Sequence, residues 1–202
     1  MIISMSDIIC VTNRKLCTEN FLCRVEKIAE CSPRAIILRE KDMDETEYLT
    51  LAESVKAITD KYNVPLIINS FYSCALKLGI PNIHMPLHLF CDISSNSMFS
   101  VKGTSCHSVD DAVNAEKLGA DYIIAGHIFA TDCKKGLAPR GLDFLKNVCN
   151  SVDIPVYAIG GISQFNYSDV IQTGAKGVCI MSGLMTCDDP QKYLKEFSIN
   201  ET

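Results

Sequence analysis

The sequence predicts a small (β/α)8 TIM barrel that forms a single domain over residues 1–202. Eight short apolar runs alternate with helical stretches, and most of these runs are uncharged and β-branched, as is typical of strands buried on both faces of a parallel sheet. Alternating strands and helices form either a doubly wound sheet or a closed barrel. The number of runs, and the glycine-containing turns that follow the last two of them, favour the barrel.

The element boundaries follow from apolar periodicity and helix-start signals. Asp44 with Glu47 has the pattern of a capping box, and Ser108 with Asp111 marks a second helix start. The region 86–98 is expected to be irregular, with at most a turn of helix. The predicted strands are 8–12, 35–39, 65–69, 82–85, 100–105, 122–125, 155–159 and 177–181, and the predicted helices are 18–30, 44–62, 108–119, 142–149, 167–173 and 190–197.

Composition limits the classes of partner. The net charge is -5 at pH 7, and no basic face of the density needed for nucleic acid is visible. No apolar run approaches the roughly 20 residues of a membrane helix, and the first residues lack the features of a signal peptide. We therefore expect a cytoplasmic protein that acts on a small molecule, without nucleic acid or membrane. The outer helices of a barrel also provide surfaces for a homodimer, which the sequence leaves open.

Cysteine usage points to the same compartment. The chain has 11 cysteines, an odd number, and contains no C-x-x-C pair. Several lie inside apolar segments, as Cys10 and Cys179 do, where cysteine behaves as a small hydrophobe. Neither metal-ligand spacing nor a secretory context is present, so we predict reduced thiols and no metal site.

The carboxyl ends of parallel barrel strands face one mouth, so residues at those ends converge regardless of their separation in sequence. The resulting set has cations, an amide, hydroxyls and imidazoles around one opening, which suits a small anionic substrate. Its candidate substrate- and phosphate-binding members are Arg39, Lys41, Asn69, Ser105, His107, Thr131, Lys134, Gly160, Gly161, Ser182 and Gly183.

His127 is the candidate acid/base group. It follows the buried strand 122–125 directly after Gly126, and Thr131 and Lys134 lie on the same loop. Imidazole titrates near neutrality, which suits the movement of one proton. His107, at the end of the preceding strand, competes with it, but Ser108 beside His107 has the pattern of a helix cap, which favours a structural role for His107.

Two glycine-containing turns resemble phosphate cradles. Ala158 to Ser163 reads A-I-G-G-I-S, and Met181 to Leu184 reads M-S-G-L. Glycine lets backbone N–H groups approach phosphate oxygens closely, and a following helix adds favourable partial charge. A single Gly-Gly pair is more often a tight turn, but the pairing across the last two strands of a barrel favours phosphate binding.

Six motifs in order along the chain resemble the thiamine phosphate synthase superfamily. They are L-R-E-K-D (38–42), I-I-N (67–69), G-T-S-C-H-S (103–108), G-H-I-F-A-T-D-C-K-K-G (126–136), I-P-V-Y-A-I-G-G-I (154–162) and I-M-S-G-L (180–184). The resemblance covers nearly the whole chain. Within the superfamily, the chain looks most like the thiazole tautomerase (TenI) branch.

Four departures from the synthase pattern lead to that choice. Where the synthases carry a glutamine that holds the pyrimidine, this chain has Ile37. Their magnesium aspartates correspond to Ser70 and Leu89 here, and their strand-six proline corresponds to His127. Mg²⁺ prefers carboxylate oxygens, so the resemblance implies that pyrophosphate displacement is lost and that a base is present instead.

The tautomerase resemblance implies an isomerase without a cofactor. The reaction would shift a proton on a 2-carboxythiazole ethyl phosphate and convert an exocyclic alkene into an aromatic ring, with His127 as the base. The glycine turns would bind the phosphate, and Arg39, Lys41, Asn69 or Lys134 would lie near the carboxylate. Three alternatives stay open: a thiamine phosphate synthase with metal ligands from elsewhere, a non-catalytic regulator that binds thiazole or thiamine phosphates, and, less favoured by the near-continuous motif match, another phosphosugar-type isomerase.

Overall fold

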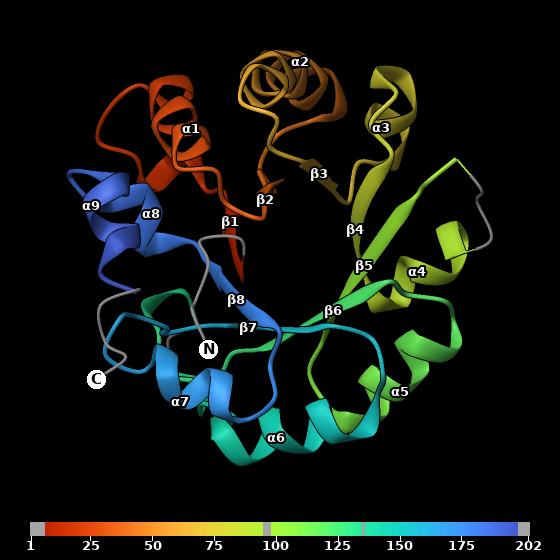
Figure 1. The fold of residues 1–202 in the computed structure, drawn as a ribbon. Helices are drawn as coiled ribbons and strands as arrows, with labels where there is room; N and C mark the ends of the chain where they lie inside the picture. Colours follow the sequence, from red (N-terminus) through yellow and green to blue (C-terminus); the bar gives the residue numbers. More distant parts are fainter. Residues whose placement is uncertain (1–6, 95–97, 135, 198–202) are drawn as a thin grey trace.

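The computed structural model is a closed barrel of eight parallel strands with helices around the outside (Figure 1). It describes residues 7–94, 98–134 and 136–197. Each strand pairs with the next one in sequence, and β8 closes the barrel by pairing with β1, with Ile8 opposite Val178. The predicted (β/α)8 fold is confirmed.

All eight predicted strands are present, each to within a residue at either end. Most of their residues are buried, because the inward side chains fill the barrel and the outward ones pack under the helices. The strands are β1 Ile8–Val11, β2 Ala35–Leu38, β3 Leu66–Asn69, β4 Asn82–Pro86, β5 Val101–Cys106, β6 Tyr122–Gly126, β7 Val156–Ile159 and β8 Gly177–Ile180.

The helices begin where their capping residues predict. Asp44 and Glu47 form a complete capping box, and the Ser108 hydroxyl accepts a hydrogen bond from the Asp111 N–H at 3.0 Å. The elements are η2 Arg14–Leu16, α1 Phe21–Glu30, α2 Glu45–Lys61, α3 Tyr72–Leu78, α4 Leu87–Ser94, α5 Val109–Lys117, η3 Asp132–Lys134, α6 Gly141–Ser151, α7 Tyr167–Gln172, α8 Ser182–Thr186 and α9 Pro190–Lys195.

Three helices correct the sequence prediction. α3 and α8 lie outside the predicted helices, and α4 spans 8 residues where an irregular segment was expected. Both α3 and α8 lack a side-chain N-cap, so no helix-start signal marks them in the sequence. α8 is only 5 residues long, which is too short for a clear apolar period.

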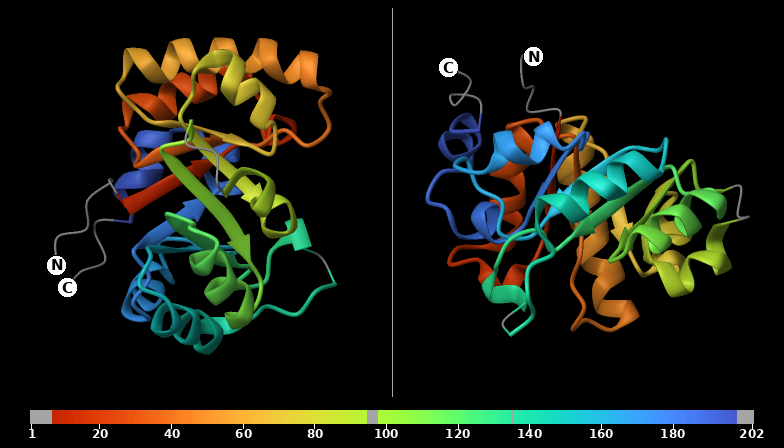
Figure 2. Two further views of the ribbon diagram at one scale, coloured as in Figure 1. Left: turned by 90° about the vertical axis from the view of Figure 1, so that its right-hand side faces the viewer. Right: turned by 90° about the horizontal axis from the view of Figure 1, so that it is seen from below.

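The strands define the two ends of the molecule. In Figure 2 the strand arrows point toward the side on which the 3-10 turn η3 lies, so the loops that follow the strands gather there. Inside the barrel, Ile9, Ile37, Tyr122 and Tyr157 belong to a separate apolar cluster from the residues under the helices. This packed layer closes the barrel below the loops.

The sequence predicts reduced thiols, several of which lie in apolar segments. Cys10 and Cys179 are buried in the core, as predicted, and burial raises the pKa of both thiols. All the cysteines whose side chains the structure describes are free thiols.

Among residues 7–94, 98–134 and 136–197, none of the helices has the length and apolar character to cross a membrane.

Candidate active site

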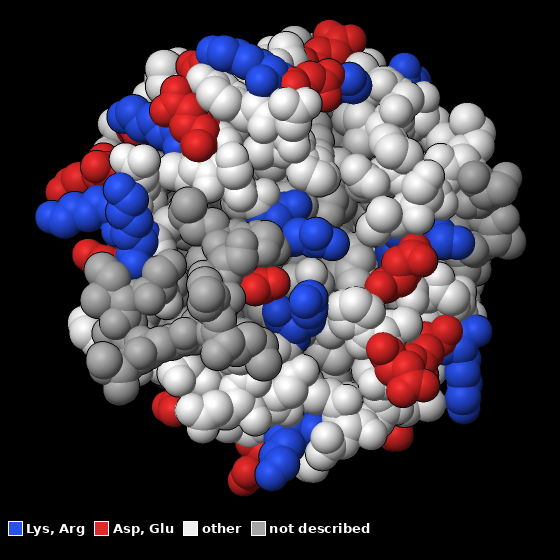
Figure 3. Space-filling model, in the orientation of Figure 1, with Lys and Arg blue, Asp and Glu red and all other residues white. Residues whose placement is uncertain are grey.

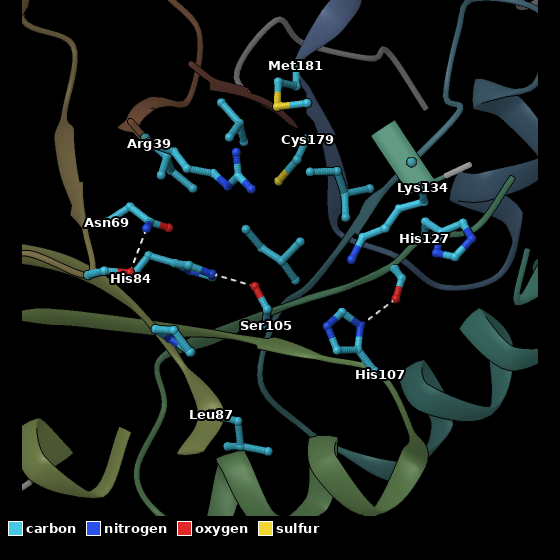
Figure 4. Close-up of a pocket in the computed structure, with 18 of the residues that line it drawn as sticks. Arg39, Asn69, His84, Leu87, Ser105, His107, His127, Lys134, Cys179 and Met181 are labelled. Atoms are coloured by element: carbon cyan, nitrogen blue, oxygen red, sulfur yellow. Dashed lines mark hydrogen bonds between the residues drawn. The ribbon is translucent and has the colours of Figure 1, made fainter. Parts of the chain in front are cut away.

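A cavity of about 780 Å³ opens at the carboxyl ends of the strands (Figure 4). All the site residues predicted from the sequence line it, although they come from six different strand ends. They are Arg39, Lys41, Asn69, Ser105, His107, His127, Thr131, Lys134, Gly160, Gly161, Ser182 and Gly183. The topology of the barrel therefore brings the predicted set together, as expected for this fold.

Three cations at this cavity have no carboxylate partner among the described residues. Within the described chain, Arg39, Lys41 and Lys134 form no ion pair. Most of the lysines and arginines that do form a salt bridge lie on the outer surface instead. In Figure 4 the Arg39 and Lys134 side chains extend into the cavity. The nearby Arg39 guanidinium lowers the pKa of Lys41, and partial burial and Lys134 act in the same direction. Like charges held together without counterions make a site for an anion.

A buried carboxylate holds the loop that carries Arg39 and Lys41. Glu40 is 2% exposed, and its side chain accepts hydrogen bonds from the Thr12 hydroxyl at 2.7 Å and from the Arg14 backbone N–H at 3.0 Å. The Thr12 hydroxyl in turn accepts a hydrogen bond from the backbone N–H of Arg39 at 2.9 Å. These bonds connect the ends of β1 and β2, so they hold the backbone of the loop that carries Arg39 and Lys41 in place.

His127 lies in the wall of the cavity and is 8% exposed. Its Nε2 is 3.4 Å from the carbonyl oxygen of Leu137. A carbonyl oxygen only accepts hydrogen bonds, so this contact requires a proton on Nε2. Its backbone and Cβ pack directly against Gly160, where a side chain would overlap them. The candidate base therefore lies beside the turn after β7.

His107 also lines the cavity, and its ring has a defined orientation. Its Nδ1 is 2.7 Å from the carbonyl oxygen of Gly126. A carbonyl accepts only, so Nδ1 carries the proton and Nε2 is left as the basic nitrogen. Ser108 caps α5 as predicted, yet this does not remove His107 from the cavity. Both histidines thus have one nitrogen bonded to a carbonyl.

The floor of the cavity contains a third histidine, which is not among the predicted site residues. His84 is buried at 4% exposure, with Nε2 at 2.8 Å from the Ser105 hydroxyl and Nδ1 at 3.1 Å from the Tyr122 hydroxyl. Burial lowers the His84 pKa to about 3, so the ring is neutral near pH 7. Tyr122 was predicted only as a strand residue, and no signal in the sequence connects it with His84.

The glycine turns have a packing role in addition to the one predicted. Gly160 and Gly161 have φ of 105° and 65°, which is the left-handed region that favours glycine. A side chain at Gly161 would overlap the Ala130 carbonyl oxygen, and one at Gly183 would overlap the Tyr193 hydroxyl. These glycines therefore allow the loops to approach each other, and their backbone also faces the cavity.

The donor set at the cavity does not fit a magnesium ion. Among the described residues that line it, Asp111 is the single carboxylate, and it accepts a hydrogen bond from the backbone N–H of His107 at 2.8 Å. Asn69 and Ser70, at the end of β3, supply an amide and a hydroxyl that bond to each other at 2.7 Å. The described part of the chain contains no group of three or more His, Cys, Asp or Glu side chains that could hold a metal ion.

Comparison with known proteins places the chain in a family. Residues 8–184 match the family described as thiamine monophosphate synthase. A thiamine-phosphate synthase of Clostridium tetani is 34% identical over 166 residues, which is 80% of this chain and 78% of that protein. Thiamine-phosphate synthase 2 of Streptococcus pneumoniae is 34% identical over 193 residues, 93% of this chain and 91% of that protein.

A solved structure supports the same assignment. The thiamine phosphate pyrophosphorylase of Pyrococcus furiosus superposes with a TM-score of 0.85 and 27% identity, covering 96% of this chain and 94% of that one. The sequence match, the barrel and the cavity at the strand ends agree with one another. The chain therefore belongs to the thiamine monophosphate synthase family.

Proposed function

We propose that this member of the family is a thiazole tautomerase, an isomerase that aromatises a 2-carboxythiazole ethyl phosphate. The observation that carries the proposal is the composition of the cavity. Among the described residues that line it are three cations without an ion pair and three histidines with defined ring contacts (His84, His107 and His127), but a single carboxylate. An anionic substrate and a proton shift need such groups. Displacement of a pyrophosphate with Mg²⁺ requires oxygen ligands that these positions lack.

The proposed reaction moves one proton and requires no other reagent. His127 removes the proton from C2 of the thiazole ring, the electron pair moves through the ring to the exocyclic carbon, and the same imidazolium returns the proton there. Aromatisation supplies the driving force, so the protein contributes orientation and one acid/base group. Because Nε2 of His127 faces the Leu137 carbonyl, Nδ1 is the nitrogen that would accept the proton.

The remaining cavity residues have binding roles in this proposal. The substrate phosphate binds at the backbone of Gly160 and Gly161 and of Ser182 and Gly183. The carboxylate binds near Arg39, where Lys41 and Asn69 complete the anion site, and Lys134 and Thr131 close the loop over the ring. His107 lies beside the reacting ring as a wall residue.

The first prediction is that tautomerisation survives EDTA and depends on His127. Formation of the aromatic thiazole is followed by absorbance for the wild type, His127→Asn and His107→Asn. We expect His127→Asn to lower kcat by about 10²–10⁴-fold, the usual contribution of a general acid/base group, and His107→Asn to lower it much less. Loss of activity in His107→Asn alone would assign the proton transfer to His107 instead.

A second candidate function is favoured by the relatives' names. The Clostridium and Streptococcus proteins are both named as thiamine-phosphate synthases, which are transferases. The same protein preparations are therefore assayed for joining a pyrimidine pyrophosphate to the thiazole phosphate in the presence of Mg²⁺. Synthase turnover without tautomerisation would overturn the proposal. Tight binding of thiamine phosphate with neither activity would instead indicate a regulator.

A further inference from the structure

The buried contact between Tyr122, His84 and Ser105 has a direction that can be worked out from its atoms. Burial raises the Tyr122 pKa well above the usual tyrosine value, so the phenol keeps its proton. In the described part of the chain, the hydroxyl has His84 Nδ1 as its one hydrogen-bond partner. If Nδ1 were protonated, the buried phenol proton would have no acceptor, which is costly. The Tyr122 O–H therefore donates to Nδ1.

The direction at Ser105 follows from the chemistry of a neutral imidazole. With Nδ1 accepting, the single proton of His84 is on Nε2, and Nε2–H donates to the Ser105 oxygen at 2.8 Å. The Ser105 hydroxyl proton cannot then point back to His84. Ser105 lines the cavity, and Figure 4 shows its side chain and His84 meeting at the cavity floor, below Arg39.

The local fold explains why these groups meet. His84 on β4 is opposite Gly103 on β5, and Gly103 is opposite Tyr122 on β6, so the three residues lie in one row across adjacent strands. A side chain at Gly103 would overlap the Tyr122 ring. The glycine thus leaves the space through which the histidine and tyrosine rings, with centroids 5.7 Å apart, come into contact.

We propose that Tyr122 and His84 act as positioning residues that fix the Ser105 hydroxyl as a hydrogen-bond donor to the substrate, at the negative charge that develops when the C2 proton leaves. This proposal rests on the proposed function, which supplies the carboxylate beside C2. The neighbouring Arg39 charge contributes to the low His84 pKa, so the guanidinium lies within electrostatic range of the same group. A donor whose direction is set before the reaction stabilises developing charge without reorganisation.

We call the two hydrogen bonds, from Tyr122 to His84 and from His84 to Ser105, the relay. The direction of the relay is tested without any turnover. Nitrogen-15 NMR of the histidines in the ligand-free protein reports which ring nitrogen of His84 carries the proton. We expect the Nε2–H form in the wild type across the neutral range, and a loss of this fixed form in Tyr122→Phe. Tyr62→Phe is the matched control, because its phenol bonds to Glu26 and Glu30 far from the barrel interior. An Nδ1–H form in the wild type overturns the proposal.

The use of the relay is tested by kinetics on folded variants. We expect Ser105→Ala to lower kcat about 10²-fold, the effect of removing one oriented donor, with a smaller change in KM. Tyr122→Phe should lower kcat by about tenfold, and His84→Gln, whose amide can donate to Ser105, should retain more activity than His84→Leu. Unchanged kcat in Ser105→Ala or Tyr122→Phe overturns the proposal. A wild type with the expected His84 form but no tautomerisation refutes the proposed function and leaves the direction of the relay intact.

Discussion

The cluster of like charges at the cavity lowers the pKa of Lys41. The adjacent Arg39 guanidinium is the largest cause of its lowered pKa, and the ordinary lysine value is 10.5. Only the ammonium form attracts an anion. The binding of a phosphorylated carboxylate therefore weakens as the pH rises through the lowered Lys41 pKa, at a pH below that of an ordinary lysine.

Replacing Arg39 with Gln removes the largest cause of this shift. We expect the alkaline rise in KM to move to higher pH, while KM at neutral pH increases by about tenfold because a charge-assisted contact is lost. The measurement is KM for the thiazole phosphate as a function of pH. Lys41→Gln is the control, because it removes the titrating group. An alkaline rise that persists unchanged in Lys41→Gln would assign the titration to another residue.

At the scale of elements, the loop after β2 depends on the buried Glu40 carboxylate. Glu40→Ala removes the acceptor for Thr12 and for the Arg14 backbone. Breaking such a buried interaction costs about 3 kcal/mol, which corresponds to a fall in Tm of roughly 6–12 °C for a domain of this size. Because the Thr12 hydroxyl also accepts from the backbone N–H of Arg39, losing Glu40 should displace Arg39, and KM should rise as well.

The matched control for Glu40 is its exposed neighbour. Asp42 pairs with Arg14 at 2.7 Å and with Lys15 at 3.0 Å on the surface, and the Arg14 hydrogen bond lowers the Asp42 pKa. Exposed pairs contribute little to stability, so Asp42→Asn should change Tm far less than Glu40→Ala. Thermal unfolding followed by circular dichroism measures both. Equal losses in the two variants would show that the buried carboxylate has no special role.

The elements also show what the sequence could predict. The strand positions were predicted correctly because a short, uninterrupted apolar run bounded by polar residues is typical of a strand buried on both faces of a parallel sheet. α3 was not predicted because it lacks a capping residue, although Gly79 at its end has a φ of 63° and is a recognisable stop signal. Strand-end residues were predicted to converge because the fold alone requires it. The contact of His84 with Tyr122 depends on strand register across Gly103, which apolar periodicity does not report.

At the scale of the whole molecule, the sign of the net charge and the sign of the cavity are opposite. The chain carries a net charge of -5, yet Arg39, Lys41 and Lys134 line the cavity without ion pairs in the part that the structure describes. The face shown in Figure 3 lies at the amino ends of the strands, and there the basic and acidic side chains are interspersed. An anionic substrate is therefore repelled by the molecule as a whole and attracted at the mouth of the barrel.

This asymmetry predicts that substrate capture depends on ionic strength. Raising KCl from about 0.05 to about 0.5 M shortens the Debye length from roughly 14 to roughly 4 Å, so the mouth is screened from a distant anion. We expect kcat/KM for the thiazole phosphate to fall several-fold over this range, with kcat nearly unchanged. The salt dependence should weaken in Lys41→Gln and persist in Lys56→Gln, which removes the same charge from an i,i+4 pair with Asp60 on α2. An equal salt dependence in all three proteins would mean that the mouth cations do not guide the substrate.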